Sequence, residues 1–205
     1  AEVTNYTLGP LPGTLPLYEV TSIILNDMNG DGFLDVVTSN SGTDHFSVLF
    51  GDGSGVFAAV KNFYGRTHAS GMVTADVNAD GYPDILASYP EENAVGIIAS
   101  NGYGDLVLPP SIAVGDGPFD LRTADVNGDG NLDVFTANEF SDDVSVLLGD
   151  GHGGFEEPIQ FAVGGTPQSV HSSDMNGDGH LDLLTANEGG GSFSVLLGDG
   201  HGQFN

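Results

Sequence analysis

Four short segments of this chain carry aspartate and asparagine at alternate positions, a spacing that suits the binding of a hard cation. The first reads Asp-Met-Asn-Gly-Asp-Gly-Phe-Leu-Asp from Asp27 to Asp35, and the others start at Asp76, Asp125 and Asp174, 49 residues apart every time. Ca²⁺ takes about six to eight oxygen ligands, and alternate side chains of a tight loop can supply them from one side. We therefore predict one Ca²⁺ in each loop, about four in all.

Within each loop the predicted ligands stand at positions 1, 3, 5, 7 and 9, with a main-chain carbonyl at position 7. Glycine at position 6 permits the sharp turn. Carboxylate and carbonyl oxygens favour Ca²⁺ over zinc or copper, and Mg²⁺ is disfavoured because its octahedron is smaller. The predicted metal-binding residues are Asp27, Asn29, Asp31, Phe33 and Asp35; Asp76, Asn78, Asp80, Tyr82 and Asp84; Asp125, Asn127, Asp129, Asn131 and Asp133; and Asp174, Asn176, Asp178, His180 and Asp182.

The residues after each loop exclude an EF-hand. An EF-hand has glutamate at position 12 and flanking helices, whereas here position 12 holds threonine or alanine and apolar, β-branched runs follow. Three aspartates crowd each loop, and without a cation each pair would repel by about 1 kcal/mol or more. The alternative is a set of Asn-Gly and Asp-Gly turns without metal. It is strongest in the second loop, where Ala79 replaces glycine and Pro83 stiffens the exit.

A second landmark repeats with the same period and indicates how the chain is organised. Gly-Asp-Gly turns start at Gly51, Gly149 and Gly198, with a decayed copy at Ser100. The segments between landmarks alternate like strands and lack the 3.6-residue period of a helix. Four strands in about 49 residues match one propeller blade. We predict an all-β fold, a β-propeller of four four-stranded blades. The whole chain, 1–205, forms one repeat domain with units at about 9–57, 58–106, 107–155 and 156–205.

The two ends of the chain fit a ring. The last repeat stops after its third strand, and residues 1–9, with the strand-like run from Val3 to Gly9, resemble the missing fourth strand. We therefore expect the N-terminal strand to close the last blade, which would leave no exposed sheet edge. The same pairing between molecules would instead give a fibre or a larger ring. The proline-rich segment from Pro10 to Pro16 is the one irregular connection.

Composition restricts the partners. The chain has 29 acidic and 3 basic side chains, a formal net charge of −26, so nucleic acid is not an expected partner. There is no cysteine, which excludes disulfides and cysteine-based zinc sites. No run approaches the roughly 18 apolar residues of a membrane helix, so we expect no membrane insertion. The start at Ala1 is that expected of a mature, processed chain.

The consensus Asp-x-Asn-Gly-Asp-Gly-x-Leu-Asp, an apolar strand and Ser-Val-Leu-Leu-Gly-Asp-Gly-x-Gly-x-Phe resembles the FG-GAP/VCBS-type repeat. The resemblance covers essentially the whole chain. It implies an integrin-α-like propeller, with calcium between the first two strands of each blade, in a secreted or cell-surface protein. Members are mostly adhesive or carbohydrate-binding, and some are appended to enzymes. Rings of this family often have seven blades, so four repeats depart from the pattern.

In such a propeller the turns between second and third strands lie on the rim opposite the aspartate loops, and loops on a rigid scaffold often carry function. There we expect any ligand surface; its candidate residues are Tyr89, Glu91, Glu139, Phe140, Asn187 and Glu188. The alternative is that these are ordinary solvated loop residues. The histidines are scattered, and no nucleophile, zinc or phosphate motif is present, so we expect no catalytic residue and no enzyme activity.

Three functions fit these observations. The first is an extracellular, non-catalytic binding or adhesion module, with a glycan or a protein as its ligand. The second is a structural subunit of a surface fibre that self-assembles by exchange of the N-terminal strand. The third is a glycan-cleaving enzyme or its accessory domain, which would use a pair of carboxylates, although no pair stands apart from the repeat. We favour the first.

Overall fold

The computed structural model describes residues 5–6, 8, 20–40, 45–66, 68–102, 106–107 and 111–205. These residues form sixteen β-strands. The part of the chain that is described contains no helix, and so none long and apolar enough to cross a membrane. The expected all-β class is confirmed.

Four antiparallel sheets follow the four sequence repeats in chain order. The first contains β1 (Val20–Asn26), β2 (Asp35–Asn40), β3 (His45–Leu49) and β4 (Lys61–Tyr64). The second contains β5 (Met72–Ala75), β6 (Asp84–Tyr89) and β7 (Ala94–Ser100), with β8 (Leu106–Val107) and β9 (Ile112–Ala113) both pairing with β7. The third contains β10 (Pro118–Ala124), β11 (Asp133–Asn138), β12 (Asp143–Leu147) and β13 (Ile159–Ala162). The fourth contains β14 (Pro167–Ser173), β15 (Asp182–Asn187) and β16 (Ser192–Leu196).

Both faces of each sheet are apolar near its centre. In the first sheet Val37 pairs with Val48, while the next pair along, Val36 and Leu49, points to the opposite side, because successive side chains of a strand alternate between faces. A sheet that is covered on both faces needs apolar residues at both sets of positions. Such a pattern suits a sheet that packs between two neighbours.

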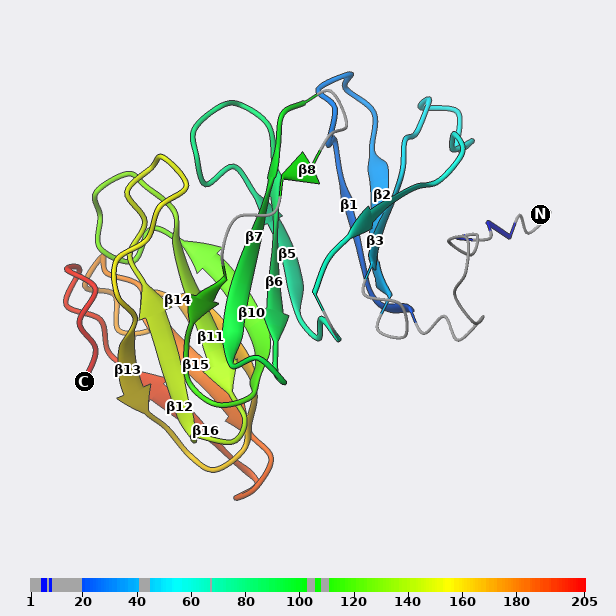
Figure 1. Cartoon of the computed structure of the whole chain (residues 1–205). Helices are drawn as coiled ribbons and strands as arrows, with labels where there is room; N and C mark the ends of the chain where they lie inside the picture. Colours follow the sequence, from blue (N-terminus) through cyan, green and yellow to red (C-terminus); the bar gives the residue numbers. More distant parts are fainter. Residues whose placement is uncertain are drawn as a thin grey trace.

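The sheets pack face to face in sequence order, as Figure 1 shows from β1–β4 on the right to β14–β16 on the left. We call the face of a sheet that meets the following sheet its leading face, and the other its trailing face. Val37 and Phe46 of the first leading face pack against Ile85 and Tyr89 of the second trailing face. Similar apolar layers join the second sheet to the third and the third to the fourth.

Within the part of the chain that the structure describes, the row of sheets does not close into a ring. The first and last sheets lie at opposite ends in Figure 1, and the fourth sheet has three strands among the described residues. Most of the expected closing strand, residues 1–9, and the segment 10–16 lie outside the described residues. Asn5 and Tyr6 are described and belong to no strand, and the Tyr6 ring lies against Phe57 of the first repeat at 5.3 Å between centroids.

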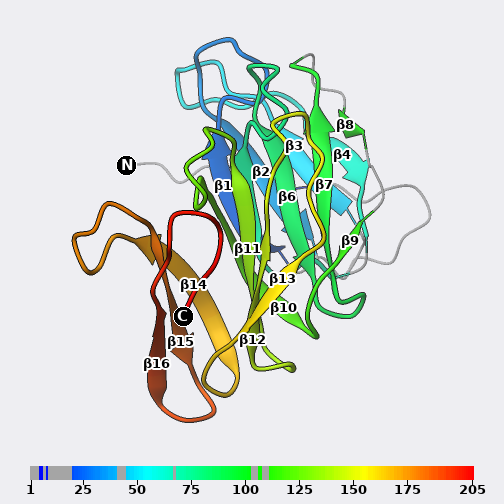
Figure 2. The same cartoon turned by 90° about the vertical axis from the view of Figure 1, so that its left-hand side faces the viewer.

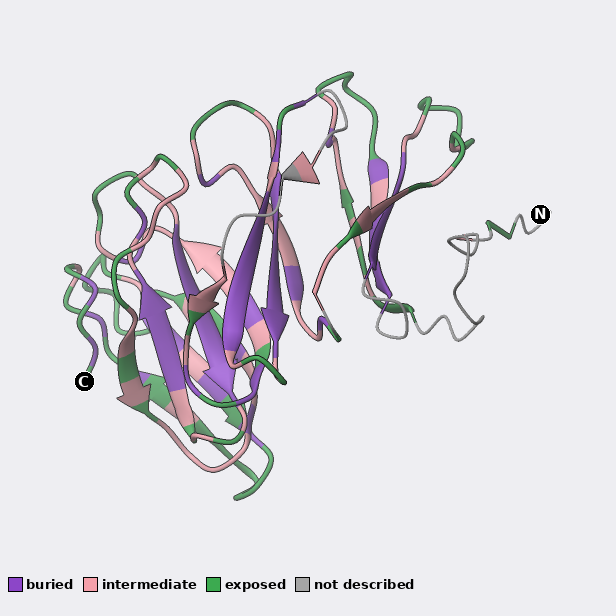
Figure 3. Ribbon diagram, in the orientation of Figure 1, coloured by how far each residue is buried: buried purple, intermediate pink, exposed green. Residues whose placement is uncertain are grey.

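Burial follows this arrangement. Figure 3 shows the buried residues concentrated in the central strands of the first three sheets, such as β3, β6, β7, β11 and β12, while β16 at the end of the row is largely exposed. These buried strands carry the loops at both rims.

Candidate metal loops and ligand surface

The aspartate loops and the Gly-Asp-Gly turns lie on one rim, as the strand order requires. In Figure 1 they run along the upper edge of the first three sheets and continue on the left at the fourth. Position 7 of each loop lies beside the turn of the same repeat: a Cβ on Gly53 would meet the Phe33 ring, and one on Gly200 would meet the His180 ring. The predicted placement of both landmarks on one rim is confirmed.

In the first loop the side chains at positions 1, 3 and 5 organise the backbone. Asp27 accepts hydrogen bonds from the amides of Gly30 at 2.7 Å and Gly32 at 2.7 Å. Asn29 Oδ1 accepts from the amide of Asp31, and Asp31 Oδ1 accepts from the amide that follows Gly32, each at 2.9 Å. Gly32 has φ +87°, a conformation that favours glycine. These three side chains are thus gathered in a single exposed turn.

The same bonds recur in the other loops. The amide at position 6 donates to the first aspartate at 2.9 Å in the second and third loops and at 3.0 Å in the fourth. Backbone amides hold the pKa of Asp129 and of Asp178 below the usual range of an aspartate, the largest cause being the amides of Asn131 and His180. Both side chains are therefore charged acceptors at neutral pH.

The aspartate at position 9 is separate from this exposed set. Asp35, Asp84, Asp133 and Asp182 are fully buried. Asp133 Oδ2 accepts from the amide of Val126 at 2.9 Å, and its Oδ1 accepts from the amide of Gly149 at 2.9 Å. It thereby ties the start of the loop to the Gly-Asp-Gly turn, 16 residues further along the chain.

Burial raises the pKa of the position-9 carboxyl in three repeats. The pKa of Asp84 rises to about 6, mainly through desolvation, and the amides of Ser100 and Val77 oppose the shift. The charges of Asp80 and Asp76 add to the rise. The exposed and buried carboxylates of a loop are thus close enough to interact. As they stand, no three His, Cys, Asp or Glu side chains within the described ranges form a group that could hold a metal ion.

The partner of this buried aspartate was not identified from the sequence. In each repeat the position-9 aspartate accepts a hydrogen bond from a backbone amide at the start of the Gly-Asp-Gly turn. The donor is Gly51, Gly149 or Gly198, and it is Ser100 in the second repeat. A Cβ on Gly51 would clash with the Leu34 carbonyl oxygen, so the chain passes too closely for a side chain there. The constant 16-residue spacing between the two groups was the available signal.

The second loop keeps the fold of the others despite its altered sequence. Ala79 stands where the other loops have glycine, and it adopts φ +57°. The amide of Asp80 donates to Asp76 Oδ1 at 3.2 Å, as the amides of Asp31 and Asp129 do to the first aspartate of their own loops. Tyr82 lies between repeats: a Cβ on Gly30 or on Gly102 would meet its ring.

On the opposite rim the structure corrects two of the six candidate ligand residues. Tyr89 is fully buried in the core between the first two sheets, and burial raises the pKa of its hydroxyl. Asn187 is also buried, and its side chain bonds to Thr185 and Ser194 within its own sheet. Both end a strand, and the sequence pattern did not distinguish the last strand residue from the first loop residue.

The other four candidates lie at the surface. Glu91 and Glu188 are exposed, Glu139 is half-buried, and Phe140 is 71% exposed. Glu91 lies 3.1 Å from His68 Nδ1. The opposite rim therefore offers exposed carboxylates and one aromatic ring.

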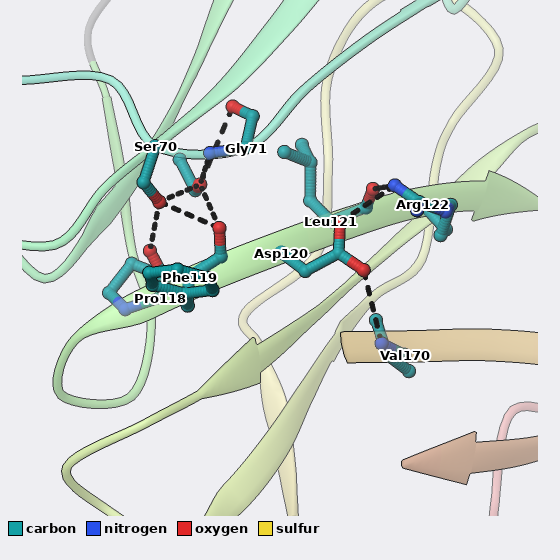
Figure 4. A network of polar contacts seen from close by, with 9 residues as sticks. Ser70, Gly71, Pro118, Phe119, Asp120, Leu121, Arg122 and Val170 are labelled. Carbon is teal, nitrogen blue, oxygen red and sulfur yellow. Dashed lines mark hydrogen bonds and ion pairs between the residues drawn. The ribbon is translucent and has the colours of Figure 1, made fainter. Parts of the chain in front are cut away.

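A second polar surface, which the sequence did not indicate, runs along the inner strands β1, β5, β10 and β14. Figure 4 shows Ser70 Oγ donating to the Phe119 carbonyl at 2.6 Å, and Asp120 Oδ2 accepting from the amide of Val170 at 3.2 Å. Arg122 pairs with Asp120 at 2.7 Å. A hollow of about 400 Å³ lies here. Its lining includes Ser22, Ser70, Phe119, Arg122 and Gln168.

Solved structures with a similar fold were found. A lectin of Agrocybe aegerita, described as recognising non-reducing terminal N-acetylglucosamine, is 24% identical over 89% of this chain and 50% of its own, with a TM-score of 0.63. BBS1N in complex with ARL6DN is 11% identical over 91% of this chain and 55% of its own, with a TM-score of 0.63. The V. cholerae biofilm matrix protein Bap1 is 20% identical over 91% of this chain and 30% of its own, with a TM-score of 0.52.

At these identities the likeness establishes the fold alone. The chain spans about half the length of the first two structures that it resembles, 50% and 55%. No curated protein matches it in sequence. The FG-GAP-like repeat family matches it three times, over residues 27–87, 76–136 and 125–185. These matches share the aspartate loops as their landmarks and cover well over half of the sequence. The chain therefore belongs to the FG-GAP-like repeat family.

Proposed function

We propose that this chain is an extracellular, non-catalytic binding module whose four aspartate loops each hold one Ca²⁺. The observation that carries the proposal is the recurrence of one exposed turn with the same carboxylate and amide acceptors in four repeats. Its family membership supports the same conclusion. The metal stabilises the rim, and the opposite rim carries the ligand.

The donor atoms are of the type that a hard cation prefers. In the first loop Asp27, Asn29 and Asp31 would hold the ion from the exposed side, with the Phe33 carbonyl and Asp35 completing the set. Asn29 Nδ2 donates to Asp31 Oδ2 at 3.1 Å, and a cation would take the place of that amide at the carboxylate. Each oxygen of Asp35 accepts one backbone amide, which leaves it a second lone pair. Bound calcium would offset the repulsion among these carboxylates.

Calcium titration followed by thermal unfolding tests the metal. A cation that binds only the folded state stabilises it by about 2.7 kcal/mol for each site at a concentration of 100 times Kd. We expect calorimetry to show about four sites and EDTA to lower the Tm markedly. Asp178→Ala should remove one site, whereas Asp199→Ala, a carboxylate of the neighbouring Gly-Asp-Gly turn, should leave the number unchanged. An unaltered Tm in EDTA together with no bound calcium would exclude the metal.

Carbohydrate is the first ligand class to test, because the A. aegerita lectin that shares the fold is described as a binder of terminal N-acetylglucosamine. A glycan array probed in calcium should show binding. Phe140→Ala on the opposite rim should abolish it, while Phe119→Ala on the inner strands should not. The reverse result would place the ligand in the hollow near Arg122. Release of sugar fragments during incubation would instead support an enzyme.

A further inference from the structure

The hollow of about 400 Å³ on the inner strands is lined by residues from all four sheets. Ser22 of β1, Met72 of β5, Phe119 of β10 and Gln168 of β14 all border it. In Figure 2, β4 of the first sheet and β16 of the fourth lie at opposite margins of the molecule, with β1 and β14 between them. The volume falls within the roughly 300–1,000 Å³ of small-molecule sites. The hollow can therefore hold one molecule of monosaccharide size.

Irregular strand pairing brings an aromatic ring and an amide to this hollow. The register of β1, β10 and β14 shifts at the same place in each strand, and the extra residues are Thr21, Phe119 and Gln168. A β-bulge leaves its extra residue out of the ladder and re-aims its side chain. Phe119 and Gln168 both line the hollow, and Phe119 is 41% exposed. The bulges thus give the third and fourth sheets one contact group each at the hollow.

The third repeat differs from the first two at one position of this surface. Ile24 and Val73 pack against the apolar layers that join the sheets. Arg122 stands at the equivalent place in the third repeat, and its side chain is 38% exposed. Only 3 of the 205 residues are lysine or arginine, against 29 acidic residues. Since two repeats use an apolar side chain at this position, packing does not explain the charge.

Asp120 holds the guanidinium of Arg122 in a fixed direction. Arg122 Nη1 donates to Asp120 Oδ1 at 2.7 Å and to the Leu121 carbonyl at 2.8 Å. Asp120 Oδ2 accepts from the amide of Val170 at 3.2 Å, so both carboxylate oxygens have a partner (Figure 4). A guanidinium has five N–H donors, and these bonds use one nitrogen. Among the described residues no group accepts from Nη2 or Nε of Arg122, and two such N–H groups match the two oxygens of a carboxylate.

Two further polar side chains of the lining have no protein partner. Within the described part of the chain, the hydroxyl of Ser22 and the amide of Gln168 make no hydrogen bond. Each group can both donate and accept, as the hydroxyl groups of a ligand can. Phe119 and Ile23, which is 66% exposed, add apolar surface beside them. The lining thus combines a fork for a carboxylate with groups for hydroxyls and for a carbon skeleton.

We propose that this hollow binds a free hydroxycarboxylate of monosaccharide size, such as a sugar acid. The carboxylate pairs with the open edge of Arg122, and the hydroxyl groups bond to Ser22 and Gln168 beside the Phe119 ring. The site is separate from the opposite rim and depends neither on calcium nor on the glycan proposed above. The net charge of −26 repels anions at long range. At physiological salt that repulsion is screened beyond about 8 Å, so the nearby guanidinium determines binding.

Isothermal titration calorimetry at physiological salt with D-glucuronate, D-glucose and acetate tests the ligand class. Glucuronate has a carboxylate where glucose has a CH₂OH group. We expect glucuronate to bind about ten-fold or more tighter than glucose or acetate, because a charged hydrogen-bonded pair contributes that much. Equal affinity for glucose would mean that the carboxylate is not recognised, and equal affinity for acetate that the hydroxyl groups are not. Either result, or no binding of glucuronate, would overturn the proposal.

Substitutions of arginine show whether the ligand lies in this hollow. Arg122→Gln should weaken glucuronate binding about ten-fold or more, and Arg122→Lys should also weaken it, because an ammonium group lacks the planar fork. Arg66→Gln is the control and should leave the affinity unchanged, since Arg66 pairs with Glu92 away from the hollow. Equal losses in Arg122→Gln and Arg66→Gln would mean that total charge governs binding, which overturns the site. Asp178→Ala should also bind normally, and a loss there would place the carboxylate at an aspartate loop instead.

A double variant separates binding from folding. Asp120→Ser with Arg122→Ile copies the first repeat, which has Ser22 and Ile24 at these positions. It should remain folded by circular dichroism, because Ile24 already packs at the equivalent place, and it should not bind glucuronate. Normal binding by the folded double variant would overturn the proposal. Gln168→Ala gives the same test independently of the ion pair: it should weaken binding, and an unchanged affinity would contradict the assignment.

Discussion

A buried aspartate at the end of each rim loop holds together two segments that the sequence separates by 16 residues. Asp133 accepts one amide from each side and has no exposed surface. Both oxygens must be acceptors, because both partners are N–H groups. The residue therefore has a role in the fold that does not depend on the proposed metal.

Asp133→Asn tests this role directly. The new amide would place an NH₂ group against a backbone N–H, and an unsatisfied buried donor costs about 1–3 kcal/mol. We expect the free energy of unfolding in EDTA to fall by that amount in urea titrations. Glu157→Gln, which removes an exposed charge, is the control and should change it by less than about 0.5 kcal/mol. Equal effects of the two variants would mean that charge, and not the paired amides, governs stability.

Position 4 of the loops offers a pair of opposite substitutions. Ala79 has φ +57°, and a left-handed conformation costs a non-glycine residue about 1–2 kcal/mol. Since glycine loses about 0.5–1 kcal/mol of entropy on folding, Ala79→Gly should raise the unfolding free energy by about 0.5–1 kcal/mol. Gly128→Ala, at φ +75° in the third loop, should lower it. Thermal unfolding measures the change in stability of each variant. If both variants were more stable than the unaltered chain, or both less stable, the prediction would be wrong.

The hydrogen-bonded turn of each loop could be anticipated because its aspartates and asparagine stand at fixed spacing, but the burial of each side chain could not. Asp35 and Asp31 are the same residue type four positions apart, and one is buried while the other is exposed. The burial of Asp35 depends on the pairing of strands, since that pairing brings the amide of Gly51 to its carboxylate. Tyr89 was misplaced for a similar reason: a tyrosine before a turn reads as exposed, yet it packs beneath the first sheet.

At the scale of strands and sheets, position in the row decides what a side chain contributes. Val146 and Val195 are the same residue type at equivalent places in β12 and β16, but one is 0% and the other 39% exposed. Truncating a buried valine removes two methyl groups at about 0.8 kcal/mol each, before the cavity is counted. We expect Val146→Ala to cost about 2 kcal/mol or more and Val195→Ala clearly less. Urea unfolding at concentrations where the chain is a single copy makes the comparison, and equal costs would mean that β16 is covered in solution.

The sequence predicted the order of strands better than the closure of the sheet row. The 49-residue period and the alternating runs indicated four sheets, and four sheets are present. Strand counting also predicted that residues 1–9 would complete the last blade. It could not give the angle between successive sheets, which side-chain volumes in the apolar layers determine. That angle decides whether the N-terminal segment meets its own fourth sheet or another copy's.

At the scale of the whole molecule, association must overcome like charge. Each chain carries −26, and four Ca²⁺ ions would reduce this formally to −18, because −26 plus 8 is −18. Salt shortens the range of this repulsion, from about 10 Å at 0.1 M to about 3 Å at 1 M. Any self-association, measured by sedimentation equilibrium, should therefore strengthen as salt rises and strengthen further with calcium. Weaker association at high salt would mean that ion pairs, and not apolar faces, join the copies.

The packing of each sheet only against its neighbours gives the molecule the energetics of a short linear array. In such an array, stability is a sum of each unit and its contacts with adjacent units. The first and last sheets have one such contact each, so in a single copy their amides should exchange with deuterium sooner than those of β6 and β11. Ring closure would give every sheet two neighbours and make the exchange rates of all four uniform. In a closed ring the first and last sheets would thus be as well protected as the inner ones, without any change within the sheets themselves.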